Sequence, residues 1–301
     1  MSEKLEGFVC GAVAIIGRPN VGKSTYLNHS IGQKISITSR KPQTTRHQIL
    51  GIKTFEQSQI VYVDTPGLQV SPDRALNRGM NKEVIRAVAE VDVVLFVVEA
   101  GKWTEADENA LALIKRAEVK IILIINKVDK VKNKPELLPF IQKITEKMNF
   151  VEVIPTTATK GDNIPLVENA IIKLLPHSEP WFSEDQITDR SVRFLVAEMI
   201  REKLTRKLGD ELPYRLNVTI EQFKEDETLV HIHATIWVES RGQKKIVIGK
   251  EGSVLKSIGE DARYDMQNML EKKVFLETWV KIKEKWSDNV NALNQFGLSS
   301  E

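Results

Sequence analysis

The stretch Gly17-Arg18-Pro19-Asn20-Val21-Gly22-Lys23-Ser24 follows directly on an apolar run at residues 8–16. Glycines in such a stretch let backbone amides turn inward around phosphate oxygens, and the helix that follows adds the positive end of its dipole. Lys23 would neutralise phosphate charge, and the Ser24 hydroxyl would bind Mg²⁺. An ordinary glycine-rich turn is the alternative. The order of strand, loop and helix favours a phosphate-binding loop that extends to Thr25.

Short apolar runs alternate with amphipathic stretches from this loop to about residue 175. Runs rich in Val and Ile are typical of strands buried on both faces. The pattern predicts strands at residues 8–16, 60–63, 91–98, 121–125 and 151–154, with helices that include residues 75–88, 105–117 and 135–148. This alternation predicts a doubly wound α/β domain with a mostly parallel sheet. Ligands of such domains bind at the carboxyl ends of the strands.

Length and composition agree with a folded protein of two domains. The chain has 301 residues, of which 42% are hydrophobic and 28% charged, which excludes collagen-like, mucin-like and wholly disordered chains. Cys10 is the single cysteine, so neither an intrachain disulfide nor a cysteine-based zinc site can form. The first residues lack a signal-peptide pattern, and no apolar run approaches the ~20 residues that span a bilayer. We therefore expect a cytosolic, reducing location.

A second motif, Asp64-Thr65-Pro66-Gly67, follows the predicted strand at residues 60–63. An acid at the end of a buried strand can reach the water shell of Mg²⁺, and the Gly67 amide can approach a terminal phosphate. A strand-ending turn is the alternative, because Pro-Gly suits one. After a phosphate-binding loop, the metal-binding interpretation is favoured.

A third motif, Asn126-Lys127-Val128-Asp129, follows the predicted strand at residues 121–125. The Asp129 carboxylate can accept hydrogen bonds from N1–H and the exocyclic amine of guanine. Adenine offers neither at these places, and an unpaired carboxylate in a closed site is costly. Asn126 would tie the loops together, and the stem of Lys127 would cover the base. The three motifs in this order predict a guanine nucleotide site.

These motifs, together with Ile35-Ser36-Ile37-Thr38-Ser39-Arg40-Lys41-Pro42-Gln43-Thr44-Thr45-Arg46, closely resemble the Era family of GTPases over essentially the whole chain. The resemblance implies a P-loop NTPase (Ras-like) fold and hydrolysis of GTP to GDP with Mg²⁺. It makes residues 33–49 the first switch loop, with Thr45 or its neighbour Thr44 joining Mg²⁺ when the γ-phosphate is bound. A static surface loop is the alternative. The fifth motif, usually Ser-Ala in the family, would be Thr157-Ala158 here, and the resemblance implies that it contacts the base through a backbone amide.

Leu68 occupies the position where many signalling GTPases carry a water-orienting glutamine. An apolar side chain cannot orient water, so we expect slow intrinsic hydrolysis. In related GTPases with an apolar residue here, the P-loop asparagine, Asn20 in this chain, helps to bind a monovalent cation such as K⁺. A local turn-stabilising role is the alternative for Asn20. The candidate catalytic residues are therefore Asn20, Lys23, Thr45, Asp64 and Gly67.

A change in the spacing of apolar residues separates the two predicted domains. We expect a GTPase domain at residues 1–176, a proline- and serine-containing linker at residues 177–187, and a second domain at residues 188–301. Period-two runs at residues 216–220, 230–238 and 274–282 predict strands with one buried face. Helical spacing predicts helices at residues 188–208, with Thr188 or Asp189 as N-cap, and around residues 255–269. The second domain is therefore predicted to be a smaller α+β domain.

The segment Gly249-Lys250-Glu251-Gly252 lies between helical stretches and within a basic cluster, Arg241, Lys244, Lys245, Lys250 and Lys256. Two glycines around a base allow close approach of a sugar–phosphate backbone, although a helix–helix turn is the default for a bare GxxG. With the order of elements, the segment resembles a type II KH domain, as in the Era family. The predicted RNA-binding residues are Lys244, Lys245, Ile248, Gly249, Lys250, Glu251, Gly252 and Lys256. His231 and His233 share one strand face, as half a metal site or, more simply, as a solvated surface.

The resemblance implies an RNA-binding GTPase that binds the 3′ end of small-subunit ribosomal RNA and assists assembly of 30S-type ribosomal subunits. The GTP or GDP state would switch access of RNA, and the protein would be a monomer. A membrane-surface or signalling GTPase is a second possibility, because the basic cluster also suits anionic lipid and the family is associated with peripheral membrane binding. An RNA-modifying enzyme is disfavoured, because the last third of the sequence offers no nucleophile, acid–base pair or metal set.

Overall fold

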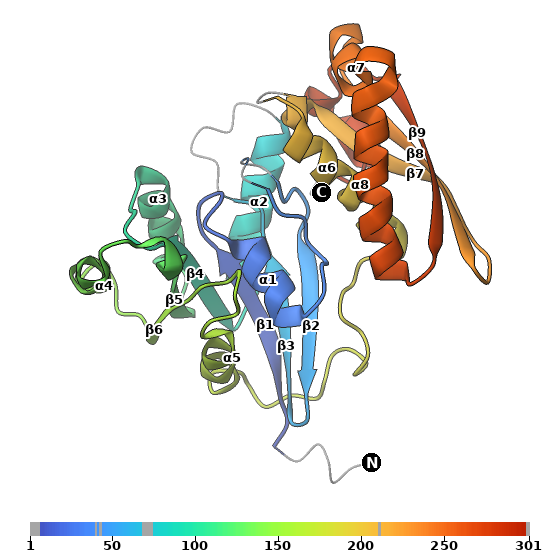
Figure 1. Ribbon diagram of the computed structural model, residues 1–301. Coiled ribbons are helices and arrows are strands. Elements are labelled where there is room, and N and C mark those ends of the chain that lie inside the picture. The colour runs from blue at the N-terminus through green and yellow to red at the C-terminus, as the bar shows by residue number, and fades with distance from the viewer. Residues whose placement is uncertain (1–6, 40, 42–43, 68–74, 210–211, 299–301) are drawn as a thin grey trace. The chain divides into compact units, whose positions relative to one another are not determined.

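Six strands in the order β2-β3-β1-β4-β5-β6 form the sheet of the first part of the chain in the computed structural model (Figure 1). The structure describes residues 7–39, 41, 44–67, 75–209 and 212–298. The strands are β1 (Val9–Ile16), β2 (Ile49–Phe55), β3 (Ser58–Asp64), β4 (Val93–Glu99), β5 (Lys120–Asn126) and β6 (Glu152–Pro155). Neighbours are parallel except β2 and β3, which are antiparallel.

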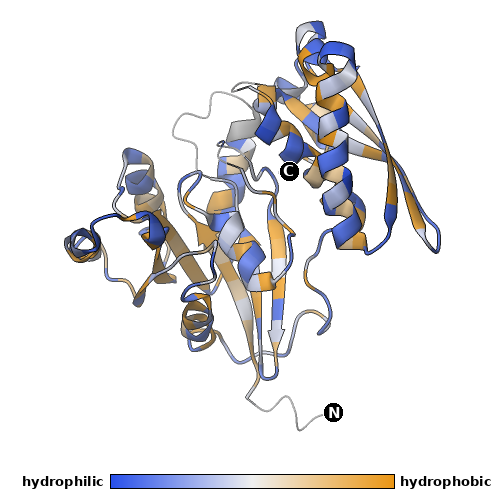
Figure 2. Ribbon diagram, in the orientation of Figure 1, coloured by the Kyte–Doolittle hydropathy of each residue, from blue (hydrophilic) through white to orange (hydrophobic). Residues whose placement is uncertain are grey.

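Helices cover both faces of this sheet. The helices α1 (Lys23–Ile31) and α5 (Ile164–Ile172) lie against one face. The opposite face, with Ala12, Ala14 and Ile16 of β1, packs against α2 (Ala75–Ala89), α3 (Glu105–Ile114) and α4 (Leu137–Thr145). Figure 2 shows the apolar colour concentrated on the strands between these layers. The doubly wound α/β fold expected from the alternating pattern is confirmed.

The sequence pattern missed β2 and misplaced several helix ends. β2 is an antiparallel edge strand whose first residue, Ile49, lay in the predicted switch loop. Only Ile49, Gly51 and Ile52 of this strand are buried, so its apolar signal is weak. The helix predicted at residues 135–148 is α4, which is shorter because Lys134–Glu136 forms a 3₁₀ turn before it. The helix predicted at residues 105–117 ends at Ile114.

The segment predicted as a linker, residues 177–187, is bound along the first sheet. His177 and Thr188 form bridges with Val9 and Gly51, respectively. The buried side chain of Gln59 accepts hydrogen bonds from the amides of Trp181 (2.8 Å) and Phe182 (3.0 Å) and donates to the Phe182 carbonyl (2.9 Å). Contacts place Met80–Asp189, which includes this segment, in the first unit.

Replacement of Gln59 by leucine tests this attachment. The change leaves two amides and one carbonyl of the segment without partners, so we expect unfolding to become easier by about 1–3 kcal/mol. The matched control is Gln57→Leu, because the Gln57 side chain is exposed in the β2–β3 turn. Urea unfolding of both variants checks the prediction. An equal effect of the two changes would contradict it.

The second unit contains a three-stranded sheet in the order β7-β8-β9, in which β7 and β8 are antiparallel and β8 and β9 parallel. Its principal elements are α6 (Val192–Lys207), β7 (Leu216–Glu225), β8 (Leu229–Val238), α7 (Arg241–Ile248), α8 (Ser253–Leu270), β9 (Lys273–Ile282) and α9 (Val290–Gln295). Buried residues of α6 and α8 form one apolar core with the sheet. The predicted α+β domain with the order α-β-β-α-α-β is confirmed.

The predicted N-cap of the first helix of this unit is wrong. The hydroxyl of Ser191 accepts the Phe194 amide at 3.3 Å and caps α6. Asp189 instead accepts the amide of Leu50 at 3.1 Å, a contact far away in sequence. Within the described residues, no helix has the length and apolar character needed to cross a membrane.

Candidate nucleotide and RNA sites

The predicted phosphate-binding loop forms a close turn between β1 and α1. Gly22 is the N-cap of α1 and has no side chain to cap the helix, so the first amides remain open to an oxygen ligand. The Lys23 ammonium donates to the carbonyls of Gly17 at 2.9 Å and Arg18 at 3.1 Å. Burial lowers the pKa of Lys23 to about 8, and the negative charge of Asp64 opposes this shift. The loop thus holds a desolvated cation that an anionic ligand would stabilise.

Three oxygen-bearing side chains from separate segments meet beside this loop. Ser24 Oγ lies 2.9 Å from both Thr45 Oγ1 and Asp64 Oδ2. Asp64 is fully buried, and burial raises its pKa. Its other oxygen, Oδ1, has no hydrogen-bond partner among the described residues. A buried carboxylate oxygen beside two hydroxyls suits a hard divalent cation, so these residues fit Mg²⁺.

Thr45, and not Thr44, faces this cluster. The Thr44 hydroxyl lies 2.7 Å from both Ser39 Oγ and the Lys41 carbonyl, so it is engaged within its own loop. The geometry therefore favours Thr45 over Thr44, and its role as a ligand of Mg²⁺ stays a prediction.

The predicted switch loop, residues 33–49, is divided between the two units. Asn28 of α1 holds its beginning, because Asn28 Oδ1 accepts the amides of Ile35 (3.0 Å) and Ser36 (2.9 Å). Contacts assign Ile37–Thr44 to the second unit. There the buried Glu202 accepts the amide of Thr38 at 2.8 Å.

The third motif is tied to the phosphate loop by Asn126. Asn126 Nδ2 donates to the Val21 carbonyl at 2.8 Å, and Asn126 Oδ1 accepts the Ala158 amide at 3.0 Å. A Cβ on Gly22 would lie 2.2 Å from Asn126 Nδ2, so the close approach requires glycine. One amide side chain thus joins three loops at the carboxyl edge of the sheet.

Lys127 and Asp129 lie at the outer end of this motif. The Lys127 ammonium donates to the Asn20 carbonyl at 2.6 Å. Lys127 has a φ of 65° and precedes a 3₁₀ turn, Val128–Lys130, on which Asp129 is exposed. The carboxylate is therefore accessible to a base edge.

Several predicted residues contribute backbone or packing and not a free side chain. The guanidinium of Arg18 is committed to Glu99 and Asp107, each at 3.0 Å, so Arg18 can offer a ligand only its backbone. Thr65 Oγ1 donates to the Ile15 carbonyl at 2.9 Å, and Gly67 lies beside Pro19. The remaining residues are Pro66 and Thr157, which are buried, and Thr25, which is partly buried. Leu68 lies outside the described residues.

Sequence reasoning missed three residues that support the site. Glu99 bonds Arg18 and Lys127, Asn28 holds the start of the switch loop, and Ser36 Oγ donates to Asp64 Oδ2 at 2.8 Å. Glu99 ends β4, which is the same strand-end position that drew attention to Asp64 and Asn126. The predicted strand stopped one residue earlier, at Val98. Asn28 and Ser36 carry no comparable signal.

The GxxG segment forms the turn between α7 and α8. Glu251 and Gly252 have φ values of 52° and 78°, and Gly252 is the N-cap of α8, without a side-chain cap. A Cβ on Gly249 would lie 2.4 Å from Val254, whereas one on Gly252 would meet no atom within 4 Å. Gly249 is therefore required by packing, and Gly252 leaves open space beside the helix end.

The basic cluster around this turn lacks ion-pair partners. Within the described part of the chain, no carboxylate pairs with Arg241, Lys244, Lys245, Lys250 or Lys256. By contrast, the bases Arg201, Lys203, Arg206 and Lys207 of α6 each pair with an acid. Of the other predicted RNA-binding residues, Ile248 ends α7 and Glu251 is exposed. Unpaired positive charge gathers at the turn and α7.

The two histidines of β8 pack beside aromatic rings. The ring of His231 lies 5.5 Å from that of Phe275, and the ring of His233 lies 5.3 Å from that of Trp279. His233 Nε2 lies 2.8 Å from Glu277. A search of the described ranges finds no group of three or more metal-ligating side chains.

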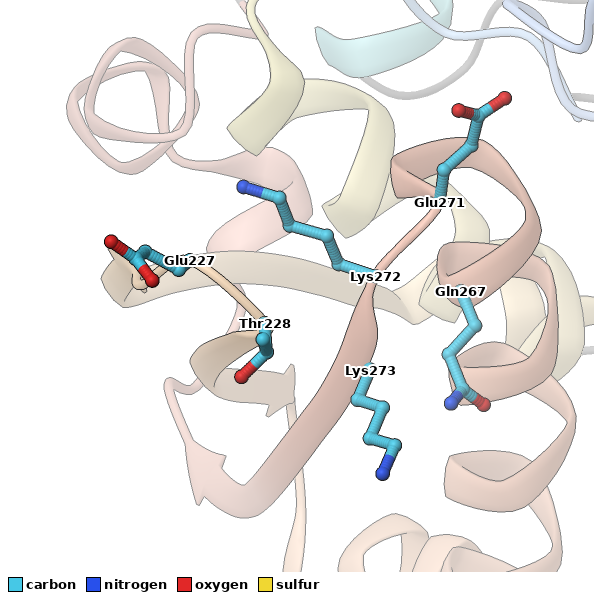
Figure 3. Close-up of a pocket in the computed structure, with 6 residues that line it drawn as sticks. All are labelled: Glu227, Thr228, Gln267, Glu271, Lys272 and Lys273. Atoms are coloured by element: carbon cyan, nitrogen blue, oxygen red, sulfur yellow. The ribbon is translucent and has the colours of Figure 1, made fainter.

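A shallow pocket at the other end of α8 is lined by Glu227, Thr228, Gln267, Glu271, Lys272 and Lys273 (Figure 3). The Lys272 ammonium already bonds Glu225 at 2.7 Å. Figure 3 shows Lys273 and Glu271 pointing in different directions, so the polar groups do not converge on one ligand. This pocket is not a candidate functional site.

Comparisons with known proteins agree with this geometry. The family described as 50S ribosome-binding GTPase matches residues 12–127, and the KH domain family matches residues 211–287. GTPase Era of Marinobacter nauticus is 53% identical over 290 residues, which cover 96% of this chain and 95% of the relative. GTPase Era of Pseudomonas aeruginosa is 52% identical over 291 residues, covering 97% and 95%.

Two solved structures are similar over the same length. The crystal structure of Era with MgGDPNP and nucleotides 1506–1542 of 16S ribosomal RNA has a TM-score of 0.93 and 37% identity, and covers 97% of this chain and 100% of that one. A point variant of Aquifex aeolicus Era bound to GDP·AlF₄⁻ has a TM-score of 0.93 and 36% identity, with the same coverage. With a phosphate loop and a KH fold in one chain, this protein belongs to the Era family of GTPases.

Proposed function

We propose that this GTPase uses its nucleotide state to control binding of single-stranded RNA, with the 3′ end of small-subunit ribosomal RNA as ligand, and so assists assembly of the small subunit. The meeting of Ser24, Thr45 and Asp64 carries the nucleotide part, because it joins P-loop, switch loop and β3 in one cluster. The Era structure with 16S ribosomal RNA supports the RNA part.

In the nucleotide site, open backbone amides at Gly22 and Lys23 hold phosphate oxygens, and Lys23 neutralises their charge. Mg²⁺, which the Era complex with MgGDPNP contains, would be held by Ser24, Thr45 and Asp64 and would supply charge stabilisation. Loss of the γ-phosphate removes a reason for Thr45 to stay in place. The segment Ile37–Thr44, which directly precedes Thr45 in the chain, belongs to the second unit. A movement of Thr45 would therefore be passed along the chain to residues of that unit.

Asp129 carries guanine selection in this proposal. Changing Asp129→Asn should weaken GTP binding by at least tenfold and favour xanthosine triphosphate, whose base edge complements an amide. Titration of both proteins with GTP, XTP and ATP checks this. Equal affinity of the unmodified protein for ATP and GTP would refute the assignment of the loop.

A monovalent cation at Asn20 is the proposed substitute for a water-orienting glutamine. Potassium in place of sodium should raise GTP turnover several-fold, and Asn20→Ala should abolish the difference. The control is Asn109→Ala, on an exposed part of α3. Turnover of the unmodified protein that is identical in both salts would eliminate this part of the proposal.

RNA binds, in this proposal, at the turn between α7 and α8. The five unpaired bases supply attraction, and the open space at Gly252 admits a phosphate to the uncapped start of α8. An anionic membrane surface is the alternative occupant of the same charge. The glycine turn favours RNA, because lipid head groups do not need close approach to the backbone. We further propose a cytoplasmic monomer, with the membrane surface as a second location.

Gly252→Asp tests the RNA site, because it places a carboxylate where phosphate would lie. RNA affinity should fall more than tenfold with GTP affinity unchanged, and each lost phosphate contact should reduce the salt slope by roughly 0.7. Lys207→Glu is unsuitable as a control, because Lys207 pairs with Asp261 at 2.6 Å.

Gly297→Asp is the matched control, since Gly297 also has a positive φ, 66°, and open space around its Cβ position. RNA affinity is measured against salt for all three proteins, with GDP and with a GTP analogue, after thermal melting shows that each is folded. Undiminished binding by Gly252→Asp would remove the RNA site. Equal affinity in the two nucleotide states would remove only the switch. Binding of anionic vesicles is measured for the same proteins. If Gly252→Asp does not change it, the vesicles are held by charge attraction to the basic cluster alone.

A further inference from the structure

Glu99 lies between the phosphate loop and the base-reading loop, and it belongs to none of the sequence motifs. It is the last residue of β4 and is paired in register with Asn126 of β5. Glu99 Oε2 accepts Lys127 Nζ at 3.0 Å and Arg18 Nη2 at 3.0 Å. One carboxylate oxygen therefore binds a cation from each of the two loops.

The conformation of Lys127 depends on these contacts. Its φ of 65° lies in the left-handed region, which a lysine occupies only when its surroundings hold it there. The Lys127 amide donates to Asn126 Oδ1 at 2.8 Å, and its ammonium bonds both the Asn20 carbonyl and Glu99. Lys127 is also the N-cap of the 3₁₀ turn that carries Asp129. Contacts at the end of the Lys127 side chain thus help to fix the direction of that turn.

We propose that Glu99 is a positioning residue for guanine recognition, which holds the Lys127 ammonium and thereby aims Asp129 at the base. The inference rests on the proposed role of Asp129. Glu99 acts through Lys127 and touches neither the phosphates nor the base in this scheme. Its second bond, to Arg18, joins the same carboxylate to the phosphate loop.

Simple electrostatics predicts the opposite result for loss of Glu99. A carboxylate near a site for a polyanion repels the ligand, so its removal alone would strengthen nucleotide binding. Burial opposes ionisation of Glu99, but the bonds from Lys127 and Arg18 outweigh it and lower the pKa of Glu99. The carboxylate is therefore charged at neutral pH. Loss of its repulsion would strengthen GTP binding, whereas loss of its positioning role would weaken GTP binding, so the sign of the change in GTP affinity separates the two effects.

The test measures affinities for GTP and for inosine triphosphate. Inosine triphosphate lacks the exocyclic amine from which Asp129 would accept a hydrogen bond. In Glu99→Ala the ratio of GTP affinity to inosine triphosphate affinity should fall about tenfold, or about 1.4 kcal/mol, mainly through weaker GTP binding. In a Lys127→Met background, Glu99→Ala should have no further effect on the ratio. The control is Glu108→Ala, because the Glu108 carboxylate also forms an ion pair with a lysine, Lys147, at 3.0 Å, and this lysine belongs to neither loop. That control should leave the ratio unchanged.

Each failure has a separate meaning. An unchanged or increased ratio in Glu99→Ala would overturn the proposal, as would full additivity with Lys127→Met. Equal loss of both nucleotides, with a lower melting temperature of the nucleotide-free protein, would reduce Glu99 to a structural role and also overturn it. A wild-type protein that does not distinguish GTP from inosine triphosphate would instead refute the proposed role of Asp129.

Discussion

The desolvation of charged groups at the carboxyl edge of the first sheet is the constraint on which the nucleotide site depends. Lys23 and Asp64 are both buried there. Burial lowers the pKa of Lys23 and raises the pKa of Asp64, so that in both cases it favours the neutral form of the side chain. Lys23 donates hydrogen bonds to carbonyls of the phosphate loop, and Asp64 accepts hydrogen bonds from Ser24 and Ser36. Movement of these loops would therefore leave a buried charge without its partners. The parallel register brings the loops to one edge, and the charges then fix their positions.

In the second unit, the described basic side chains form ion pairs on α6 but not around the turn between α7 and α8. On α6, every basic side chain from Arg201 to Lys207 has an acidic partner, so this part of the helix contributes little net field. Around the turn between α7 and α8, the basic side chains form no ion pair with an acid in the described part of the chain. The chain as a whole has a net charge of only +2, so this local excess of positive charge is what would attract an anionic ligand. Binding of such a ligand would therefore depend on this one place on the surface.

Local patterns in the sequence were enough to predict both folds and the motifs of the nucleotide site. Buried strands have continuous apolar runs, and each motif follows such a run. What the sequence did not predict depends on contacts between distant residues. Asp189 is a good N-cap by type, but Leu50 engages it and Ser191 caps the helix. Likewise, a pattern cannot show that Arg18 is paired with Glu99 and Asp107, because these partners lie more than 80 residues away.

The glycine N-caps of α1 and α8 have a thermodynamic consequence. Side chains of Ser191, Ser240 and Asn289 cap α6, α7 and α9, whereas Gly22 and Gly252 provide no such oxygen. A bound phosphate would complete these two helix ends in place of a side chain. Each unit then gains part of its resistance to heat from its own ligand, in proportion to the logarithm of ligand concentration. The stability of either unit in the cell would therefore follow the supply of nucleotide or RNA.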